Sequence, residues 1–479
     1  MRIRRTLFLM AALLLWAGCP GGGEEMVDGV RIVSEPQVSV DLPDILERGR
    51  LIALTGYSAN GYFLYKGQPL GFEYELLERL AEHLGVALEI RVVADMDEIL
   101  NRLNEGEGDL VAHGLTVTRR RTRRVRFTDP HNFIRQMLVQ RLPDGWRDMK
   151  RHEIDDSLIT NPVHLINRTV HVRRQSAYYS RLVNLSEEIG GPISIVTVPG
   201  DVTTEMLIGQ VAAGEIDLTV ADENIALINR AYYDNIDVRT PISLPQRIAW
   251  AVRNNSPELA DAINAWLHDI KLEPTYNVLY ARYFKDKRFF RRRLDSEYFS
   301  ISGDKLSPWD SLIQVHADSL DWDWKLLAAM IFQESRFDPR ARSWIGARGL
   351  MQLMPRTGRE FGAANLIDPA QNLRAGRRFL QWLQDYWRAI EDPIERIKFV
   401  LASYNTGQGH VADARRLAEK FGADPDRWEG NVATYLLKKS LPEFYNDPVV
   451  EFGYCRGEEP VQYVEEILER YRHYAAVIN

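Results

Sequence analysis

The chain has 479 residues, of which 45% are apolar and 27% are charged. This composition excludes collagen-like, disulfide-dense and intrinsically disordered proteins, and the length predicts two or three domains. A net charge of −7 offers no general attraction to nucleic acid, so no nucleic-acid partner is expected. The two cysteines are Cys19 and Cys455, and if Cys19 lies in a processing site no internal disulfide can form.

The first 19 residues have the pattern of an export signal. A basic start (residues 1–5) precedes an apolar run over 7–16, which is about half the length that a bilayer-spanning helix needs. The segment resembles a bacterial lipoprotein signal, which implies that Cys19 is lipidated after cleavage. Pro20 is similar to the residue found in lipoproteins sent to the outer membrane, which implies a lipid-anchored protein on its periplasmic face. Trp16 departs from the usual aliphatic residue, so an ordinary cleaved signal is the alternative.

The next part of the chain is predicted to fold as an α/β domain over residues 38–285. Glycine-rich residues 20–37 are predicted to form a flexible tether. Strands are expected at 51–54, 86–93 and 110–112, with helical stripes between them, and a second such block runs from 193 to 252. Strands that alternate with helices favour parallel α/β architecture.

The composition changes near residue 285. A basic stretch without a continuing helical stripe predicts a linker over 286–305. Beyond it, residues 306–479 show one helical stripe after another and no clear strand alternation, which predicts an all-α domain. The expected fold class is therefore multidomain, with an α/β domain followed by a helical one.

The α/β domain resembles the extracellular solute-binding proteins of the amino-acid type. The likeness rests on five segments in order: 71–77 (GFEYELL), 108–110 (GDL), 115–118 (LTVT), 127–130 (FTDP) and 214–222 (GEIDLTVAD). It implies two α/β lobes that close on a small ligand, in keeping with the crevices found at strand ends.

The same resemblance implies three ligand contacts. Arg121 matches the arginine that holds the ligand's carboxylate, Asp222 the acceptor for its α-amino group, and Thr116 a hydroxyl and backbone contact. An amino acid or a cell-wall peptide is the ligand class that follows. Six arginines lie within residues 119–126, so a solvated basic face is the alternative for the run, and a cleft that binds nothing stays open.

In the helical domain, a carboxylate continues an apolar stripe. Leu327, Met330 and Ile331 are followed at helical spacing by Glu334, and Asp338–Pro339 is expected to stop the helix. A carboxylate at the rim of an apolar face loses water, which raises its pKa and suits a general acid.

The blocks that follow Glu334 resemble the lysozyme-like lytic transglycosylase domain over roughly 306–479. They are Glu334–Ser335, the stretch 349–355 (GLMQLMP), the stretch 402–407 (ASYNTG) and Tyr463–Val464. The resemblance implies non-hydrolytic cleavage of the β-1,4 bond between N-acetylmuramic acid and N-acetylglucosamine in peptidoglycan, with a 1,6-anhydro product. A hydrolase of lysozyme type and a non-catalytic glycan or solute binder are the alternatives.

The resemblance also assigns residue roles. Glu334 is the acid/base and Ser335 its hydrogen-bonding neighbour, while the residues implied to line the glycan groove are Gln352, Met354, Tyr404, Asn405 and Tyr463. Core packing is the preferred interpretation for Met351. Core packing is also preferred for six tryptophans of this domain, namely Trp322, Trp324, Trp344, Trp382, Trp387 and Trp428. No metal-ligand spacing or phosphate loop is found, so no metal and no cofactor is predicted.

Overall fold

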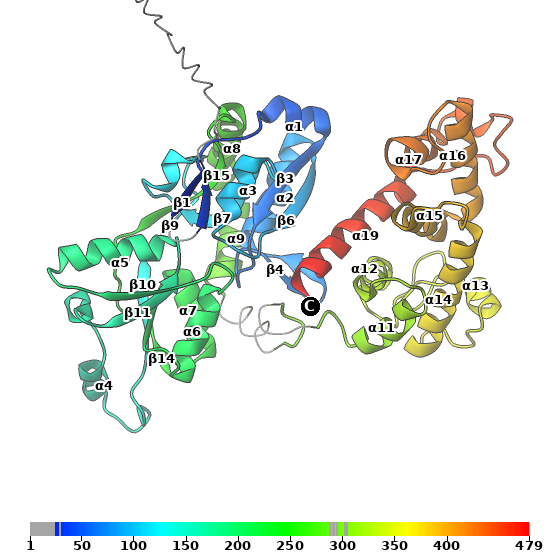
Figure 1. The fold of residues 1–479 in the computed structure, drawn as a ribbon. Coiled ribbons are helices and arrows are strands. Elements are labelled where there is room, and N and C mark those ends of the chain that lie inside the picture. The colour runs from blue at the N-terminus through cyan, green and yellow to red at the C-terminus, as the bar shows by residue number, and fades with distance from the viewer. Residues whose placement is uncertain are drawn as a thin grey trace, which may run out of the picture.

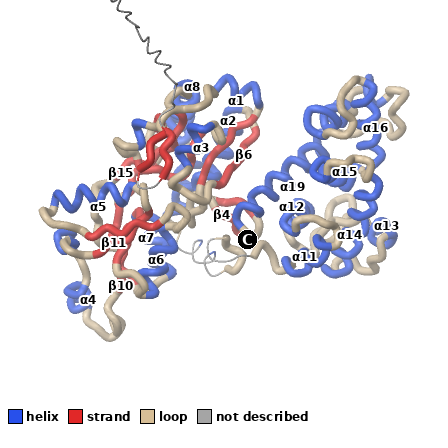
Figure 2. The backbone as a smooth tube through the Cα atoms, in the orientation of Figure 1, coloured by secondary structure: helices blue, strands red, loops and turns tan. Residues whose placement is uncertain are grey.

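The computed structural model describes residues 24–27, 30–286, 289, 293, 296–300 and 305–478. These residues form an α/β body made of two lobes and a separate helical body (Figure 1). Strands are confined to the first body in Figure 2. Cys19, Pro20 and Trp16 lie outside the described residues.

The first lobe is built on a sheet with strand order β6-β3-β7-β15-β8. The predicted strands are present, and β3 pairs in parallel with β6 and β7. The predicted parallel architecture holds for β3, β6 and β7, whereas β15 returns from the other lobe and runs antiparallel to β7. The elements of this lobe are α1 (Leu42–Arg48), β3 (Arg50–Thr55), β4 (Phe63–Tyr65), β5 (Gln68–Leu70), α2 (Phe72–Leu84), β6 (Ala87–Val92), α3 (Ile99–Glu105), β7 (Leu110–Thr116), β8 (Val125–Phe127), β9 (Asn132–Ile134), β15 (Gln246–Arg253), α8 (Pro257–Leu272) and α9 (Pro274–Phe284).

The second lobe has strand order β12-β11-β13-β10-β14. Here β11 is parallel to β12 and β13, whereas β10 is antiparallel to β13 because it enters directly from the first lobe. Its elements are β10 (Gln136–Arg141), α4 (Arg151–Ser157), β11 (Thr169–Arg173), α5 (Ala177–Glu188), β12 (Ser194–Val198), α6 (Thr204–Ala213), β13 (Leu218–Asp222), α7 (Glu223–Tyr232) and β14 (Ile236–Asp237).

The tether predicted for residues 20–37 is wrong over part of its length. β1 (Glu24–Val27) and β2 (Val30–Val33) form an antiparallel hairpin. Val33 donates its amide to Oδ1 of Asn101 at 2.9 Å, and its carbonyl accepts from Nδ2 of Asn104 at 3.0 Å. Two buried asparagines of α3 thus satisfy the backbone of this strand, which a glycine count does not reveal.

The helical body packs around a large apolar core. Its members come from α11, α12, α14, α15, α16 and α19, and they include the stripe residues Leu327, Met330 and Ile331, all fully buried. The elements are α11 (Asp310–Asp318), α12 (Trp324–Ser335), α13 (Pro355–Glu360), α14 (Pro369–Tyr386), α15 (Pro393–Thr406), α16 (Gln408–Lys420), α17 (Ala433–Lys438), α18 (Pro442–Tyr445) and α19 (Glu458–Val477).

The two bodies meet at the C-terminal end of α19, which reaches the β4–β5 hairpin (Figure 1). Tyr62 is hydrogen-bonded to Nδ1 of His473, and Tyr474 donates to the carbonyl of Gly67 at 2.7 Å. Leu64 of the hairpin is buried in the core of the helical body. The β4–β5 hairpin therefore packs against the helical body.

Candidate active site and ligand cleft

Glu334 lies in the last turn of α12, where the apolar stripe ends. Asp323 caps the start of this helix by accepting the amide of Lys325 at 2.9 Å. The helix ends at Ser335 because Arg336 and Phe337 take left-handed backbone conformations, with φ of 52° and 64°. The stop therefore comes three residues before Asp338. Glu334 is half-buried, as its place on the stripe predicts.

Tyr463 of α19 donates its hydroxyl to Oε1 of Glu334. Burial raises the pKa of Glu334 to about 7, and the hydrogen bond from Tyr463 opposes part of that rise because it stabilises the charged form. Burial, together with the charge of Glu334, raises the pKa of both Tyr463 and Tyr404 well above the usual range. Both phenols therefore stay protonated while Glu334 is close to half-protonated at neutral pH.

The segment 349–352 lies next to the end of α12 and is held by three side chains. Ser335 donates its hydroxyl to the carbonyl of Leu350 at 2.7 Å, and Tyr404 donates to the carbonyl of Met351 at 2.7 Å. Asn372 accepts the amide of Met351 at 2.8 Å. The expected hydrogen bond between Ser335 and Glu334 is therefore wrong. The serine hydroxyl donates instead to the carbonyl of Leu350, which is buried and needs a hydrogen-bond partner.

Gln352 and Met351 complete this segment in different ways. Gln352 has a left-handed φ of 45°, and its side-chain amide donates to the carbonyl of Gly349 at 2.8 Å. Its amide therefore shapes the turn that it belongs to. Met351 is fully buried, and a Cβ added at Gly376 of α14 would lie 2.1 Å from its sulfur. The preference for Met351 as a core residue is confirmed.

The remaining predicted groove residues are at the surface. Asn405 is exposed at the end of α15 and lines a hollow together with Tyr463. The other residues of that hollow are Gln333, Arg456, Glu458, Glu459, Gln462 and Glu466. Met354 is 41% exposed at the start of α13. The structure therefore brings Glu334, Tyr463 and Tyr404 together and places Asn405 beside them.

The tryptophans predicted to be core residues divide into three groups, and Trp324 is the one that is partly buried and packs against the core. Trp322, Trp387 and Trp428 are buried, as predicted. Trp344 is 96% exposed and Trp382 is 41% exposed, so core packing is the wrong interpretation for these two. Trp344 lies on the turn that follows α12, where no other part of the described chain covers its side chain.

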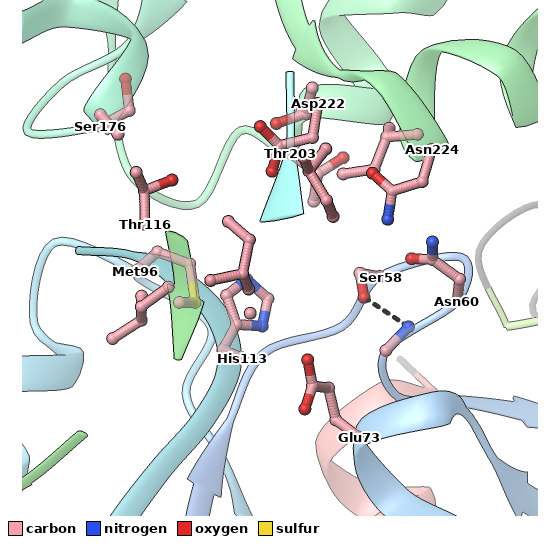
Figure 3. Close-up of a pocket in the computed structure, with 18 of the residues that line it drawn as sticks. Ser58, Asn60, Glu73, Met96, His113, Thr116, Ser176, Thr203, Asp222 and Asn224 are labelled. Atoms are coloured by element: carbon pink, nitrogen blue, oxygen red, sulfur yellow. Dashed lines mark hydrogen bonds between the residues drawn. The ribbon is translucent and has the colours of Figure 1, made fainter. Parts of the chain in front are cut away.

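The second candidate site is a cleft of about 240 Å³ between the lobes of the α/β body. Thr116, Arg121 and Asp222 all line it, and Figure 3 shows Thr116 and Asp222 on opposite sides of the opening. Across the cleft, Nε of Arg174 lies 3.0 Å from Oδ2 of Asp97, which joins the two lobes. The three residues implied by the sequence resemblance therefore share one cavity.

Buried charges of both signs face this cleft. Burial raises the pKa of Asp222 to about 7, against the pull of Arg173, Tyr178 and Arg121, and burial lowers the pKa of Arg121 to about 10. Arg121 also donates to the carbonyl of Thr116 at 3.0 Å. Burial in the cleft therefore disfavours the charged forms of Asp222 and Arg121, and a ligand group of opposite charge would stabilise them.

The structure separates the arginines of the run 119–126. Arg121 alone of them lines the cleft. Arg124 is buried and donates to Oδ1 of Asn101 at 2.6 Å, while Arg120 donates to Oε1 of Gln175 at 2.6 Å. A single solvated basic face therefore does not describe the run.

Several cleft residues were missed by reasoning from the sequence. Arg173 ends β11, Glu205 lies in the first turn of α6, and both line the cleft with Glu73 and His113. Burial lowers the pKa of His113 to about 4, so this ring is neutral at neutral pH. The available signal was position, because residues at the carboxyl end of a strand face the crevice in such folds.

Comparison with known proteins agrees with this arrangement. The family model of bacterial extracellular solute-binding proteins, family 3, matches residues 53–286, and the transglycosylase SLT domain model matches residues 311–426. A membrane-bound lytic murein transglycosylase F of Desulfosudis oleivorans is 38% identical over 474 residues, which cover 98% of each chain. The chain belongs to the membrane-bound lytic murein transglycosylase F family.

A second transglycosylase F, from Saccharophagus degradans, is 32% identical over 90% of this chain and 83% of its own. Among solved structures, an ancestral amino-acid-binding protein, described as a precursor of cyclohexadienyl dehydratase, is 25% identical. It covers 51% of this chain and 99% of its own, with a TM-score of 0.42. The fusion of a solute-binding domain to a transglycosylase domain, expected from the sequence, is confirmed as a transglycosylase F arrangement.

Proposed function

We propose that Glu334 is the single acid/base with which this protein cleaves peptidoglycan. The protein is a peptidoglycan lytic transglycosylase by family and domain content. The observation that supports the role of Glu334 is its half-buried carboxyl, with a pKa raised to about 7 and a protonated phenol bonded to it. A group with this pKa can give a proton and take one back near neutral pH.

One carboxyl suffices if the sugar supplies its own nucleophile. Protonated Glu334 gives its proton to the glycosidic oxygen between N-acetylmuramic acid and N-acetylglucosamine, and the bond to C1 breaks with help from the N-acetyl group. Glu334 then accepts the proton of the C6 hydroxyl, whose oxygen closes the 1,6-anhydro ring on C1. Intramolecular attack has a high effective molarity, so no carboxylate is needed to activate water. No other carboxylate of the described chain contributes to the pKa shift of Glu334.

Digestion of murein sacculi tests this reaction. The products should carry 1,6-anhydro ends and be lighter by one water than those of a hydrolase of lysozyme type. Glu334→Gln should abolish the products, because the amide donates no proton to the leaving oxygen. Retained activity with anhydro products in this variant would refute the role of Glu334, and hydrated products from the wild-type protein would favour the hydrolase. Binding of sacculi without cleavage would favour a glycan-binding protein.

For the cleft between the lobes, we propose a ligand that carries a carboxylate and an amino group. Arg121 suits the carboxylate because a guanidinium makes two parallel hydrogen bonds to it, and Asp222 suits the amino group. Arg173 is a second cation in the same cavity, and its buried Nε has no partner within the described chain. An amino acid or peptide with a second carboxylate fits this pair of arginines better than one with a neutral side chain.

We further propose that this ligand changes the lyase rate through the β4–β5 hairpin. Ser58 and Asn60 line the cleft (Figure 3), and β4 of the hairpin begins three residues later, at Phe63. At Gly67, an added Cβ would lie 2.8 Å from the ring of Phe337 and 3.0 Å from that of Phe332, the residues that flank the last turn of α12. Movement of the cleft segment therefore reaches the helix end that carries Glu334. Regulation requires that the ligand bind two states of the protein with different affinity.

Calorimetric titration with amino acids and muropeptides, followed in parallel by lysis of sacculi, tests both parts. A ligand that gives heat and changes the rate supports the proposal. If no compound of the set gave heat, the proposed ligand class would be refuted. Heat without a change in the lysis rate would refute only the coupling between the cleft and the active site.

Membrane association accords with the names of the related proteins, and no helix among the described residues is long and apolar enough to cross a bilayer. We propose that a lipid on Cys19 anchors the protein to the periplasmic face of the outer membrane. Metabolic labelling with a fatty-acid analogue should mark the wild-type protein and not Cys19→Ser, and the variant should be found in the soluble periplasmic fraction.

A further inference from the structure

The turn that follows the catalytic helix presents exposed apolar and cationic side chains side by side in the sequence. Trp344 is 96% exposed and Ile345 is 56% exposed. Arg340 and Arg342 beside them are exposed as well. Large apolar side chains that lie together on a surface indicate an interaction site, whereas single ones are common on any protein. Residues 340–348 are called the stem loop.

The stem loop has a fixed conformation. Ser343 donates its amide to the carbonyl of Ala347 at 3.0 Å, and its hydroxyl accepts the amide of Ala347 at 2.9 Å. Arg342 and Arg348 are opposite each other in an antiparallel bridge, so their side chains share one face. Gln352 donates to the backbone at the base of the loop at 3.1 Å. Because these hydrogen bonds already fix the loop, it loses less conformational entropy on binding than a flexible loop would.

Positive charge is concentrated in this region. Residues 336–359 contain six arginines and one aspartate, whereas the whole chain has a net charge of −7. Among the described residues, no ion pair is formed by Arg340, Arg342, Arg348 or Arg356, and the buried Nε of Arg348 has no hydrogen-bond partner there. The region therefore suits an anionic partner.

We infer that the stem loop binds the peptide stem of the glycan strand being cleaved. This inference rests on the proposed function. The sugar backbone of peptidoglycan is uncharged, and its negative charges are the carboxylates of the stems, which also carry alanine methyl groups. Guanidinium groups of Arg340 and Arg342 pair with the carboxylates, and Trp344 and Ile345 cover the methyl groups. The loop begins six residues after Glu334 and ends just before the Gly349 segment of the active site, so the stem it holds belongs to a sugar near the scissile bond.

Two forms of one substrate test this inference: glycan strands with their stems, and strands from which an amidase has removed them. The stripped strands keep one lactyl carboxylate on each N-acetylmuramic acid and lack the carboxylates and methyl groups of the stem. Wild-type protein should cleave the first with the higher kcat/KM. Arg340→Ala/Arg342→Ala should lower kcat/KM on stem-bearing strands about five- to tenfold and change it less than about twofold on stripped strands, as expected for two exposed ion pairs. Raising the salt from about 0.1 M to about 0.5 M should shrink the wild-type preference.

Arg388→Ala/Arg427→Ala is the matched control, because both arginines are exposed, lack ion pairs within the described chain and lie far along it from the loop. This control should leave both rates unchanged. Trp344→Ala should lower the rate on stem-bearing strands only. Equal losses on both substrates would make Trp344 a sugar platform and overturn the stem assignment, as would loop variants with wild-type rates. Absence of anhydro products from the wild-type protein on either substrate would instead refute the proposed function.

Discussion

Replacing Tyr463 with phenylalanine should move the alkaline limb of the pH–rate profile to higher pH. In the structure the phenol donates to Oε1 of Glu334 and holds the pKa of this carboxyl below the value that burial alone would give. The variant removes a donor that stabilises the charged form, so the carboxyl stays protonated to higher pH. Because the free enzyme must carry the proton that it gives to the leaving oxygen, kcat/KM falls as pH rises through the pKa of Glu334.

The size of the shift follows from the hydrogen bond that is lost. A hydrogen bond to a charged group is worth about 1.5–3 kcal/mol, and about 1.4 kcal/mol corresponds to one pH unit. Since the wild-type pKa of Glu334 is about 7, the falling limb should lie near neutral pH in the wild type and about one to two units higher in Tyr463→Phe. The rate at the plateau should fall as well, because the phenol also fixes the carboxyl's orientation.

Initial rates of anhydro-product release from solubilised glycan strands, measured from about pH 5 to about pH 10, give this profile. Tyr404→Phe is the matched control, because its hydroxyl donates to the carbonyl of Met351 and not to Glu334. It should lower the rate without moving the limb. An unmoved limb in Tyr463→Phe, or a limb moved to lower pH, would refute the role given to this hydrogen bond.

Three further predictions concern other parts of the molecule. Gly67→Ala should abolish the effect of a cleft ligand on lysis while calorimetric binding persists; Gly85→Ala, which has a similar positive φ but open space around it, should not. Arg121→Lys should weaken ligand binding about 10- to 100-fold by calorimetry through loss of a bidentate pair, and exposed Arg123→Lys should not. Asp413 accepts hydrogen bonds from the buried Lys439 and from two backbone amides. Asp413→Asn should therefore lower the free energy of unfolding of the helical body in urea by about 3–5 kcal/mol, and a loss below about 1 kcal/mol would contradict this.

The sequence by itself determined the order of the two bodies and the position of the proposed acid/base. Helical spacing from Leu327 to Glu334 is a local property, and an α-helix places such residues on one face whatever surrounds it. The ordered motif blocks likewise predicted both domain families, and the two family models confirm them.

Only the tertiary structure decided which side chains meet. Tyr463 lies 129 residues after Glu334, and no local pattern reveals that α19 brings its phenol to the carboxyl. The partner of Ser335 and the choice of Arg121 within its run depend in the same way on segments distant in the sequence. Burial is also a tertiary property: Trp344 and Trp387 are the same residue type, yet one is 96% exposed and the other 4%. The sequence determines the chemical type of each side chain. The environment that sets a side chain's pKa and exposure forms only when segments distant in the sequence pack together.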